Sequence, residues 1–235
     1  MGIERFRGES APNAEMKCLC VFVMDVSGSM EPCIDELNMA LRNFFKDVEY
    51  SKGLPESTKE QLEICIYAFD EEVRLLRNPC LLKPGEVAPK LVQRGSTTES
   101  VAALKTAIKM VEDRKDFYKD TGQPYYRPWI VFMTDGEPYP FREGEISTLE
   151  AQIKADEHAK KYRILGLGVG DSISEKTLRR LTNNNARKLK GTNFGAFFDW
   201  LSNSMGIIVS SKPGQKVDIS AGSEEWMSKF DDFEV

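Results

Sequence analysis

The chain has 235 residues, 41% hydrophobic and 29% charged, so it can bury a large core without disulfide bonds. Its net charge of −5 and pI near 5.2 argue against nucleic-acid binding, which favours basic surfaces. No apolar run approaches the roughly 18 residues of a membrane span, and the start lacks the apolar core of a secretory signal. The five cysteines lack zinc-like spacing and are interpreted as buried free thiols, which predicts a cytoplasmic location.

The chain divides into one large domain and two short ends. Residues 1–15 are polar and are predicted to be a flexible leader. The main domain is predicted to cover residues 16–210. In the C-terminal extension, residues 211–235, glycine and proline break any regular pattern. Three aromatic residues could nevertheless dock this extension on the domain: Trp226, Phe230 and Phe233.

Hydrophobic spacing predicts the order of the regular elements. A buried strand at 18–24 is followed by an amphipathic helix at about 32–50. Further strands are predicted at 62–69, 73–76, 129–133, 163–169 and 187–189, and further helices at 101–111, 148–162, 174–181 and 194–209. Strands that alternate with helices predict an α/β three-layer sandwich, with a mostly parallel central sheet and helices on both faces. Residues 73–76 are predicted to be its one antiparallel edge strand.

Oxygen-bearing side chains gather where two of these strands end. The stretch Val-Phe-Val-Met-Asp-Val-Ser-Gly-Ser-Met, residues 21–30, ends a strand with Asp25, Ser27 and Ser29. The strand at 129–133 runs into Thr-Asp-Gly with Asp135, and a hydroxyl-rich turn, residues 95–98, lies between the two in sequence. The carboxyl ends of parallel strands share one edge, so these groups are expected to converge. Their hard oxygens suit Mg²⁺ or Mn²⁺.

These segments together resemble the metal-ion-dependent adhesion site of von Willebrand factor A (VWA) domains. The resemblance covers roughly residues 16–210. It implies a VWA fold and a site for Mg²⁺ or Mn²⁺, with Ca²⁺ less favoured, formed by Asp25, Ser27, Ser29, Thr98 and Asp135. The threonine has an alternative. Counting back from Ala-Ala-Leu at 102–104 selects Thr98, whereas counting on from Gly95 selects Thr97.

The resemblance also implies a function. Two aspartates only neutralise a divalent ion, which can then take a glutamate or aspartate carboxylate from a protein partner. We therefore expect a non-catalytic, monomeric protein-interaction module that binds neither nucleic acid nor membrane. The segments 125–129, 135–138 and 194–202 are most similar to bacterial cytoplasmic single-domain VWA proteins associated with tellurium-resistance gene clusters, which implies a tellurite or stress response.

Two alternative functions remain open. A Mg²⁺-dependent phosphohydrolase or phosphotransferase could use Asp25, although such enzymes place a second aspartate where this chain has Ser27. A metal-free scaffold is the third possibility. Other polar or glycine-containing features have plain structural interpretations: a loop for Glu137, an exposed helix face for His158, a turn for Asp70–Glu72, and close packing for Gly166 and Gly168.

Overall fold

The structure, a computed structural model, describes residues 6, 8–212 and 215–228. Its sheet has the strand order β3-β2-β1-β4-β5-β6-β7. The strands are β1 (Cys18–Asp25), β2 (Leu62–Phe69), β3 (Val73–Cys80), β4 (Trp129–Thr134), β5 (Arg163–Gly168), β6 (Ala186–Leu189) and β7 (Met227–Ser228). The helices are η1 (Gly28–Cys33), α2 (Ile34–Glu49), α3 (Thr58–Gln61), α4 (Ser100–Thr121), α5 (Glu143–His158), α6 (Glu175–Leu181), α7 (Phe194–Val209) and α8 (Ser223–Trp226).

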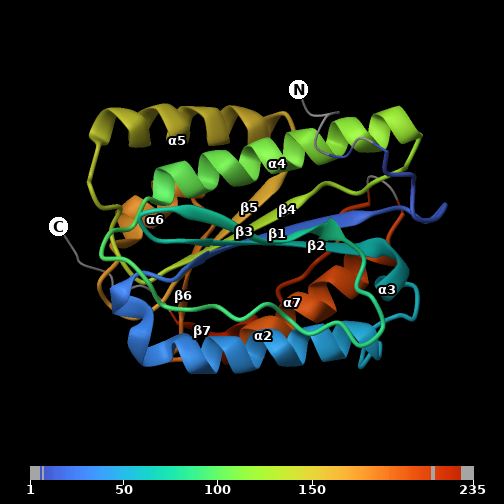
Figure 1. The fold of residues 1–235 in the computed structure, drawn as a ribbon, viewed down its shortest axis with the longest axis horizontal. Helices are drawn as coiled ribbons and strands as arrows, with labels where there is room; N and C mark the ends of the chain where they lie inside the picture. Colours follow the sequence, from blue (N-terminus) through green and yellow to red (C-terminus); the bar gives the residue numbers. More distant parts are fainter. Residues whose placement is uncertain (1–5, 7, 213–214, 229–235) are drawn as a thin grey trace.

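Helices cover both faces of this sheet, as predicted. Figure 1 shows α4 and α5 on one side of the strands and α2 and α7 on the other. The five strands in the middle of the sheet run parallel to one another, in the order β2-β1-β4-β5-β6. Strand β3 pairs antiparallel with β2 at one edge. The short β7 adds an antiparallel partner to β6 at the other edge. The predicted α/β three-layer sandwich is therefore confirmed, with one further short strand.

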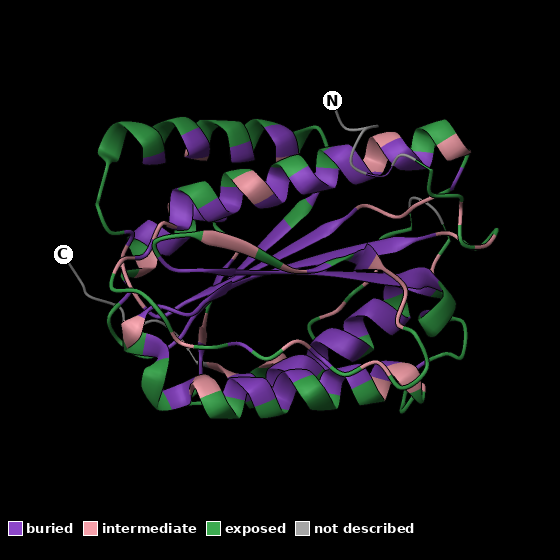
Figure 2. Ribbon diagram, in the orientation of Figure 1, coloured by how far each residue is buried: buried purple, intermediate pink, exposed green. Residues whose placement is uncertain are grey.

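Alternation along β1 explains why two helical layers are needed. Cys20, Phe22 and Met24 pack into the core under α2 and α7, whereas Leu19, Val21 and Val23 pack under α4 and α5. Every residue of β1 is buried. Figure 2 shows the same contrast, with buried central strands and exposed outer helix faces. A strand that is apolar on both faces belongs in the middle of an α/β sheet.

Some element boundaries differ from the prediction. Helix α5 begins at Glu143, five residues before the predicted start, and ends at His158 instead of 162. Its two acidic residues in the first turn suit a helix N-terminus, and Lys160 beyond its end has a positive φ of 55°. Strand β3 continues to Cys80, beyond the predicted 76. The 3-10 helix η1 before α2 was not predicted.

Several smaller predictions can be compared directly. His158 is exposed at the end of α5, as expected. A Cβ on Gly166 would lie 2.6 Å from Cγ2 of Thr182, which confirms that close packing requires this glycine. All five cysteines are free, and four of them are buried. Within the described residues, no helix is long and apolar enough to cross a bilayer.

Both ends of the chain contact the domain where the structure describes them. In the segment predicted as a leader, Glu9 pairs with Arg114 at 2.9 Å, and Asn13 donates to the backbone of Glu60 at 3.0 Å. In the C-terminal extension, Trp226 is 1% exposed and its ring centroid lies 5.0 Å from that of Trp200. Phe230 and Phe233 lie outside the described residues. The boundaries at 15/16 and 210/211 stay predictions.

Candidate metal centre

The candidate site lies where the chain leaves two neighbouring strands. Asp25 ends β1, and Asp135 directly follows β4, which pairs with β1 from Cys20 to Met24. The chain passes from β1 to β2 through α2 on one face, and from β3 to β4 through α4 on the other. β1 and β4 therefore flank the point where the strand order reverses, which is where α/β sheets place their ligand sites.

Four of the five predicted ligands form one hydrogen-bonded group. The backbone N–H of Ser27 donates to Oδ1 of Asp25 at 2.8 Å. The hydroxyls of Ser27 and Ser29 lie 3.2 Å apart, and the Ser29 hydroxyl donates to Oδ1 of Asp135 at 2.8 Å. A continuous chain of contacts therefore joins the turn after β1 to the turn after β4, as the convergence of strand ends predicted.

The two aspartates of this group are both buried. Asp25 is fully buried and Asp135 is 8% exposed, while Ser29 between them is exposed. Burial raises the pKa of Asp25 to about 6, although hydrogen bonds from Thr134 and Ser27 lower it. Burial likewise raises the pKa of Asp135. No lysine or arginine among the described residues forms an ion pair with either carboxylate.

Thr98 lies on a neighbouring segment. Its backbone N–H donates to the carbonyl of Tyr139 at 3.1 Å and its carbonyl accepts from the Tyr139 N–H at 3.0 Å. The N–H of Arg94 donates to the carbonyl of Val26 at 2.9 Å, which brings this loop to the turn after β1. Thr98 is 7% exposed, whereas Thr97 is half-buried. The Thr98 hydroxyl forms no hydrogen bond to the site's aspartates or serines. Which of the two threonines is a metal ligand therefore stays a prediction.

Thr134 is a site residue that the sequence analysis missed. Its hydroxyl donates to Oδ2 of Asp25 at 2.6 Å and lies 3.2 Å from the carbonyl oxygen of Gly136. Both oxygens of Asp25 are thus held by donors from the two strand ends. The signal was present, because Thr134 is the residue before Asp135 at the end of an apolar strand. The sequence prediction included its neighbour Asp135 but not Thr134 itself.

Asp70 is a third aspartate at a strand end, but it has its own cation. It follows β2, is fully buried, and its two oxygens accept from Nη1 and Nη2 of Arg74 at 2.8 and 2.6 Å. Burial alone would raise the pKa of Asp70, but hydrogen bonds from Arg74 and Glu72 lower it overall. Its carbonyl accepts from the N–H of Glu99 at 2.9 Å. The turn predicted at Asp70–Glu72 is therefore also hydrogen-bonded to the loop that carries Thr98.

The loop after Asp135 is anchored on both sides. Oε1 of Glu137 accepts from the N–H of Ser174 at 2.6 Å, at the start of α6, so Glu137 is not merely a solvated loop residue. Arg142 pairs with Glu99 at 3.2 Å. Tyr139 and Phe141 lie between these anchors and are 63% and 52% exposed. The site is therefore bordered by a fixed loop with exposed aromatic side chains.

The donor set suits a hard divalent cation. Two carboxylates and two hydroxyls lie in one group, and no lysine or arginine of the described residues pairs with the carboxylates. Over residues 6, 8–212 and 215–228 no cluster of three or more His, Cys, Asp or Glu side chains suits a metal. A carboxylate–hydroxyl donor set is instead the kind of site that binds a divalent cation with oxygen ligands.

Comparisons with known proteins agree with this geometry. The sequence profile of the von Willebrand factor type A domain matches residues 20–137, just over half of the chain. A search of curated protein sequences found no match.

Solved structures with a similar fold come from varied sources. Proximal thread matrix protein 1 from the mussel byssus, solved with a zinc-occupied MIDAS motif, is 14% identical with a TM-score of 0.54, over 83% of this chain and 49% of that chain. The present chain thus spans about half the length of that protein. The vWF domain of the type V pili tip protein Mfa5 from Porphyromonas gingivalis is 11% identical with a TM-score of 0.58, over 87% and 99% of the two chains. The ArnB paralog VWA2 from Sulfolobus acidocaldarius is 17% identical with a TM-score of 0.53, over 81% and 45%.

Proposed function

Because this chain belongs to the von Willebrand factor type A domain family, we propose that it is a metal-dependent protein-interaction module. Asp25, Ser27, Ser29, Thr98 and Asp135 would hold one divalent ion, Mg²⁺ or Mn²⁺. The partner would be a protein that presents an aspartate or glutamate at the exposed side of the site, next to Ser29.

One observation carries this proposal. A fully buried aspartate, Asp25, is hydrogen-bonded among the described residues to neutral donors, the hydroxyls of Thr134 and Ser27 and the Ser27 backbone N–H, and it shares the site with a second buried aspartate. An uncompensated buried carboxylate is costly, so proteins pair such groups or use them to bind metal. A bound divalent ion would compensate both aspartates and would attract an additional carboxylate, since serine and threonine hydroxyls add no charge.

The residues around the ion have distinct tasks in this proposal. Thr134 and the Ser27 N–H orient the two oxygens of Asp25, and Ser29 orients Asp135. Because Ser29 is exposed, the partner can approach without opening the fold. The fixed loop with Tyr139 and Phe141 would exclude water from one side of the contact, which strengthens the attraction between opposite charges.

The alternative enzyme would use Asp25 as a nucleophile toward phosphate esters. Two features favour binding over catalysis. Both oxygens of Asp25 already accept hydrogen bonds and the side chain is fully buried, which suits a fixed ligand better than an attacking group. Ser27 also stands where an acid/base aspartate would be needed. Phosphatase turnover that depends on Asp25 would reverse this preference.

A metal titration tests the site directly. Isothermal titration with MgCl₂ and MnCl₂ should give one binding site in the wild type and none in Asp25→Asn, which keeps the side-chain shape. Asp171→Asn is the matched control, because Asp171 follows β5 at the same sheet edge, is 91% exposed and pairs with Lys188. A wild type that binds neither ion would favour a metal-free scaffold.

The partner contact needs a second experiment. Proteins captured from a lysate in Mg²⁺ and released by EDTA would be identified, and their interface carboxylates changed singly to amides. We expect one such change to remove binding. If every amide variant still binds and binding survives EDTA, the metal does not bridge the two proteins.

The wider setting rests on sequence resemblance alone. We propose a cytoplasmic role in a bacterial tellurite or stress response, because the segments 125–129, 135–138 and 194–202 are similar to proteins associated with tellurium-resistance gene clusters. Deletion of the gene should then change tellurite tolerance.

A further inference from the structure

A cavity of about 360 Å³ lies at the end of the sheet where β4 and β5 begin, opposite the end that carries Asp25 and Asp135. Trp129 and Arg163, the first residues of β4 and β5, line it, whereas Asp135 follows the last residue of β4. Its other wall is Trp200 of α7 together with residues 217–220, Ser223, Trp226 and Met227 of the C-terminal extension. The volume falls in the range of small-molecule sites, roughly 300–1,000 Å³.

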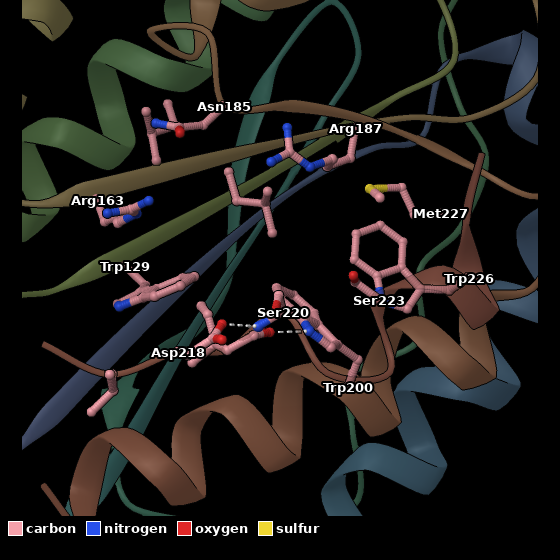
Figure 3. A pocket seen from close by; sticks show the side chains of 14 residues that line it. Trp129, Arg163, Asn185, Arg187, Trp200, Asp218, Ser220, Ser223, Trp226 and Met227 are labelled. Carbon is pink, nitrogen blue, oxygen red and sulfur yellow. Dashed lines mark hydrogen bonds between the residues drawn. The ribbon is translucent and has the colours of Figure 1, made fainter. Parts of the chain in front are cut away.

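Three indole rings give this cavity an aromatic lining. Figure 3 shows Trp129, Trp200 and Trp226 around it. Nε1 of Trp200 donates to the carbonyl of Ile219 at 2.7 Å. Nε1 of Trp226 is buried, and no group in the described part of the chain accepts its hydrogen bond. A buried N–H without an acceptor is unusual.

The polar lining is predominantly cationic. Arg163 and Arg187 line the cavity and are exposed, and neither is paired with a carboxylate of any described residue. Asp218 is the opposing charge, and it accepts a hydrogen bond from the N–H of Ser220 at 2.9 Å. In Figure 3 the Arg187 side chain lies across the cavity from Trp200. Two guanidinium groups against one carboxylate leave one net positive charge.

We propose that this cavity binds a small aromatic carboxylate. Its ring would pack against the indoles, and its carboxylate would accept hydrogen bonds from the guanidinium groups. Two sources share this chemistry: a free aromatic acid, and a peptide with adjacent aromatic and acidic residues. The site is separate from the proposed metal centre and needs no metal.

The test uses the full chain in EDTA, so that the metal centre takes no carboxylate. Isothermal titration with 3-phenylpropionate should show binding, and 3-phenylpropan-1-ol and propionate should bind about tenfold more weakly or not at all, because each lacks one recognised group. Arg187→Gln should weaken 3-phenylpropionate binding by about tenfold. The control is Arg42→Gln, which removes the same charge from an exposed position on α2 outside this cavity and should change nothing.

One further variant and one further ligand test the aromatic wall and the source of the ligand. Trp226→Phe makes the aromatic wall smaller, so it should weaken 3-phenylpropionate binding severalfold, and it should also lower the melting temperature because Trp226 is buried in the core. Equal binding of the acid and the alcohol, or unchanged binding in Arg187→Gln, would overturn the proposal. N-acetyl-Phe-Asp amide distinguishes the sources: tighter binding than the free acid indicates a peptide, and weaker binding indicates a small molecule.

One segment of the chain has the same chemistry as the proposed ligand. Residues 229–235, Lys-Phe-Asp-Asp-Phe-Glu-Val, lie outside the described residues and carry the same two chemical groups. The full-length double variant Phe230→Ser with Phe233→Ser should bind 3-phenylpropionate as the wild type does. Binding that is much tighter in this variant would overturn an external ligand, because the chain's own C-terminus would then compete for the cavity.

Discussion

Two buried carboxylates at opposite ends of the sheet are treated differently by the fold. Glu63, near the start of β2, accepts from Nε and Nη2 of Arg114 at 2.8 and 2.7 Å and from the hydroxyl of Tyr118 at 2.6 Å. Asp25, at the end of β1, is buried to the same degree, but its donors among the described residues are all neutral: the Ser27 backbone N–H and the hydroxyls of Thr134 and Ser27. Arg114 compensates the charge of Glu63, whereas the charge of Asp25 would be compensated by the proposed divalent ion.

A structural and a candidate functional acid in this molecule differ in their hydrogen-bond partners. Burial alone does not distinguish them, since both side chains are fully buried. Their partners distinguish them. Glu63 is paired with Arg114, whose guanidinium group also contacts the rings of Phe6 and Phe117. A buried acid that has only neutral donors is the better candidate for a binding role.

The largest effect is expected from removing the internal cation. Arg114→Met would leave Glu63 buried without a counter-charge and should lower the free energy of unfolding by about 3–5 kcal/mol. Urea denaturation at pH 7 measures this loss. The double variant with Glu63→Gln should recover part of it. A loss below about 1 kcal/mol would mean that the pair is no more valuable than a surface ion pair.

Stability without metal should fall with rising pH in the range where Asp25 titrates. Its pKa is raised to about 6 in the folded protein, so the stability linked to it is present below about pH 4 and is lost as pH rises through 6. Without metal, Asp25→Asn should therefore become more stable than the wild type between pH 4 and 7. The gain is about 3 kcal/mol at most, from roughly two pKa units. Urea curves in EDTA at several pH values measure it, and a gain that does not grow with pH would contradict the raised pKa.

Added metal should reverse that penalty in the wild type. Free Mg²⁺ at 100 times its dissociation constant should stabilise the fold by about 2.7 kcal/mol. Asp25→Ala should abolish this gain and partner binding while the sheet remains folded. Asp135→Ala should weaken both less, if that aspartate acts through water as the family resemblance implies. Melting curves with and without EDTA provide the measurement, and a melting temperature indifferent to millimolar Mg²⁺ would count against the site.

Thr134→Val examines the orienting hydroxyl. It removes the donor to Oδ2 of Asp25, which should cost about 1 kcal/mol of stability and weaken Mg²⁺ binding severalfold. Thr182→Val is the control, because its buried hydroxyl donates to the carbonyl of Leu178 on α6 instead. It should lower stability by a similar amount and leave the Mg²⁺ affinity unchanged. Equal affinities in the two variants would show that Thr134 does not orient the aspartate.

The smallest effect should distinguish the two threonines. Thr98→Ala is expected to weaken Mg²⁺ affinity and metal-dependent partner binding more than Thr97→Ala, as the ungapped count to the helix start predicts. Side-by-side titration of the two variants gives the answer. The reverse order would move the ligand to Thr97.

The sequence by itself determined the fold class and the place of the candidate site. Apolar runs such as residues 18–24 of β1 are buried on both faces, so length and composition alone identify them as central strands. The convergence of Asp25, Ser27, Ser29 and Asp135 followed from the rule that parallel strands end at one edge. Membership of the VWA family is likewise readable from these motifs.

Only the tertiary structure decided which polar groups compensate one another. Thr134 meets Asp25 across 109 positions of sequence, and Arg114 meets Glu63 across 51. Side-chain periodicity does not specify such partners, because it gives the face of an element but not what lies opposite. The contact of Trp226 with Trp200 and the short strand β7 were undecided for the same reason. A segment without a regular pattern gets its position from the surface it covers.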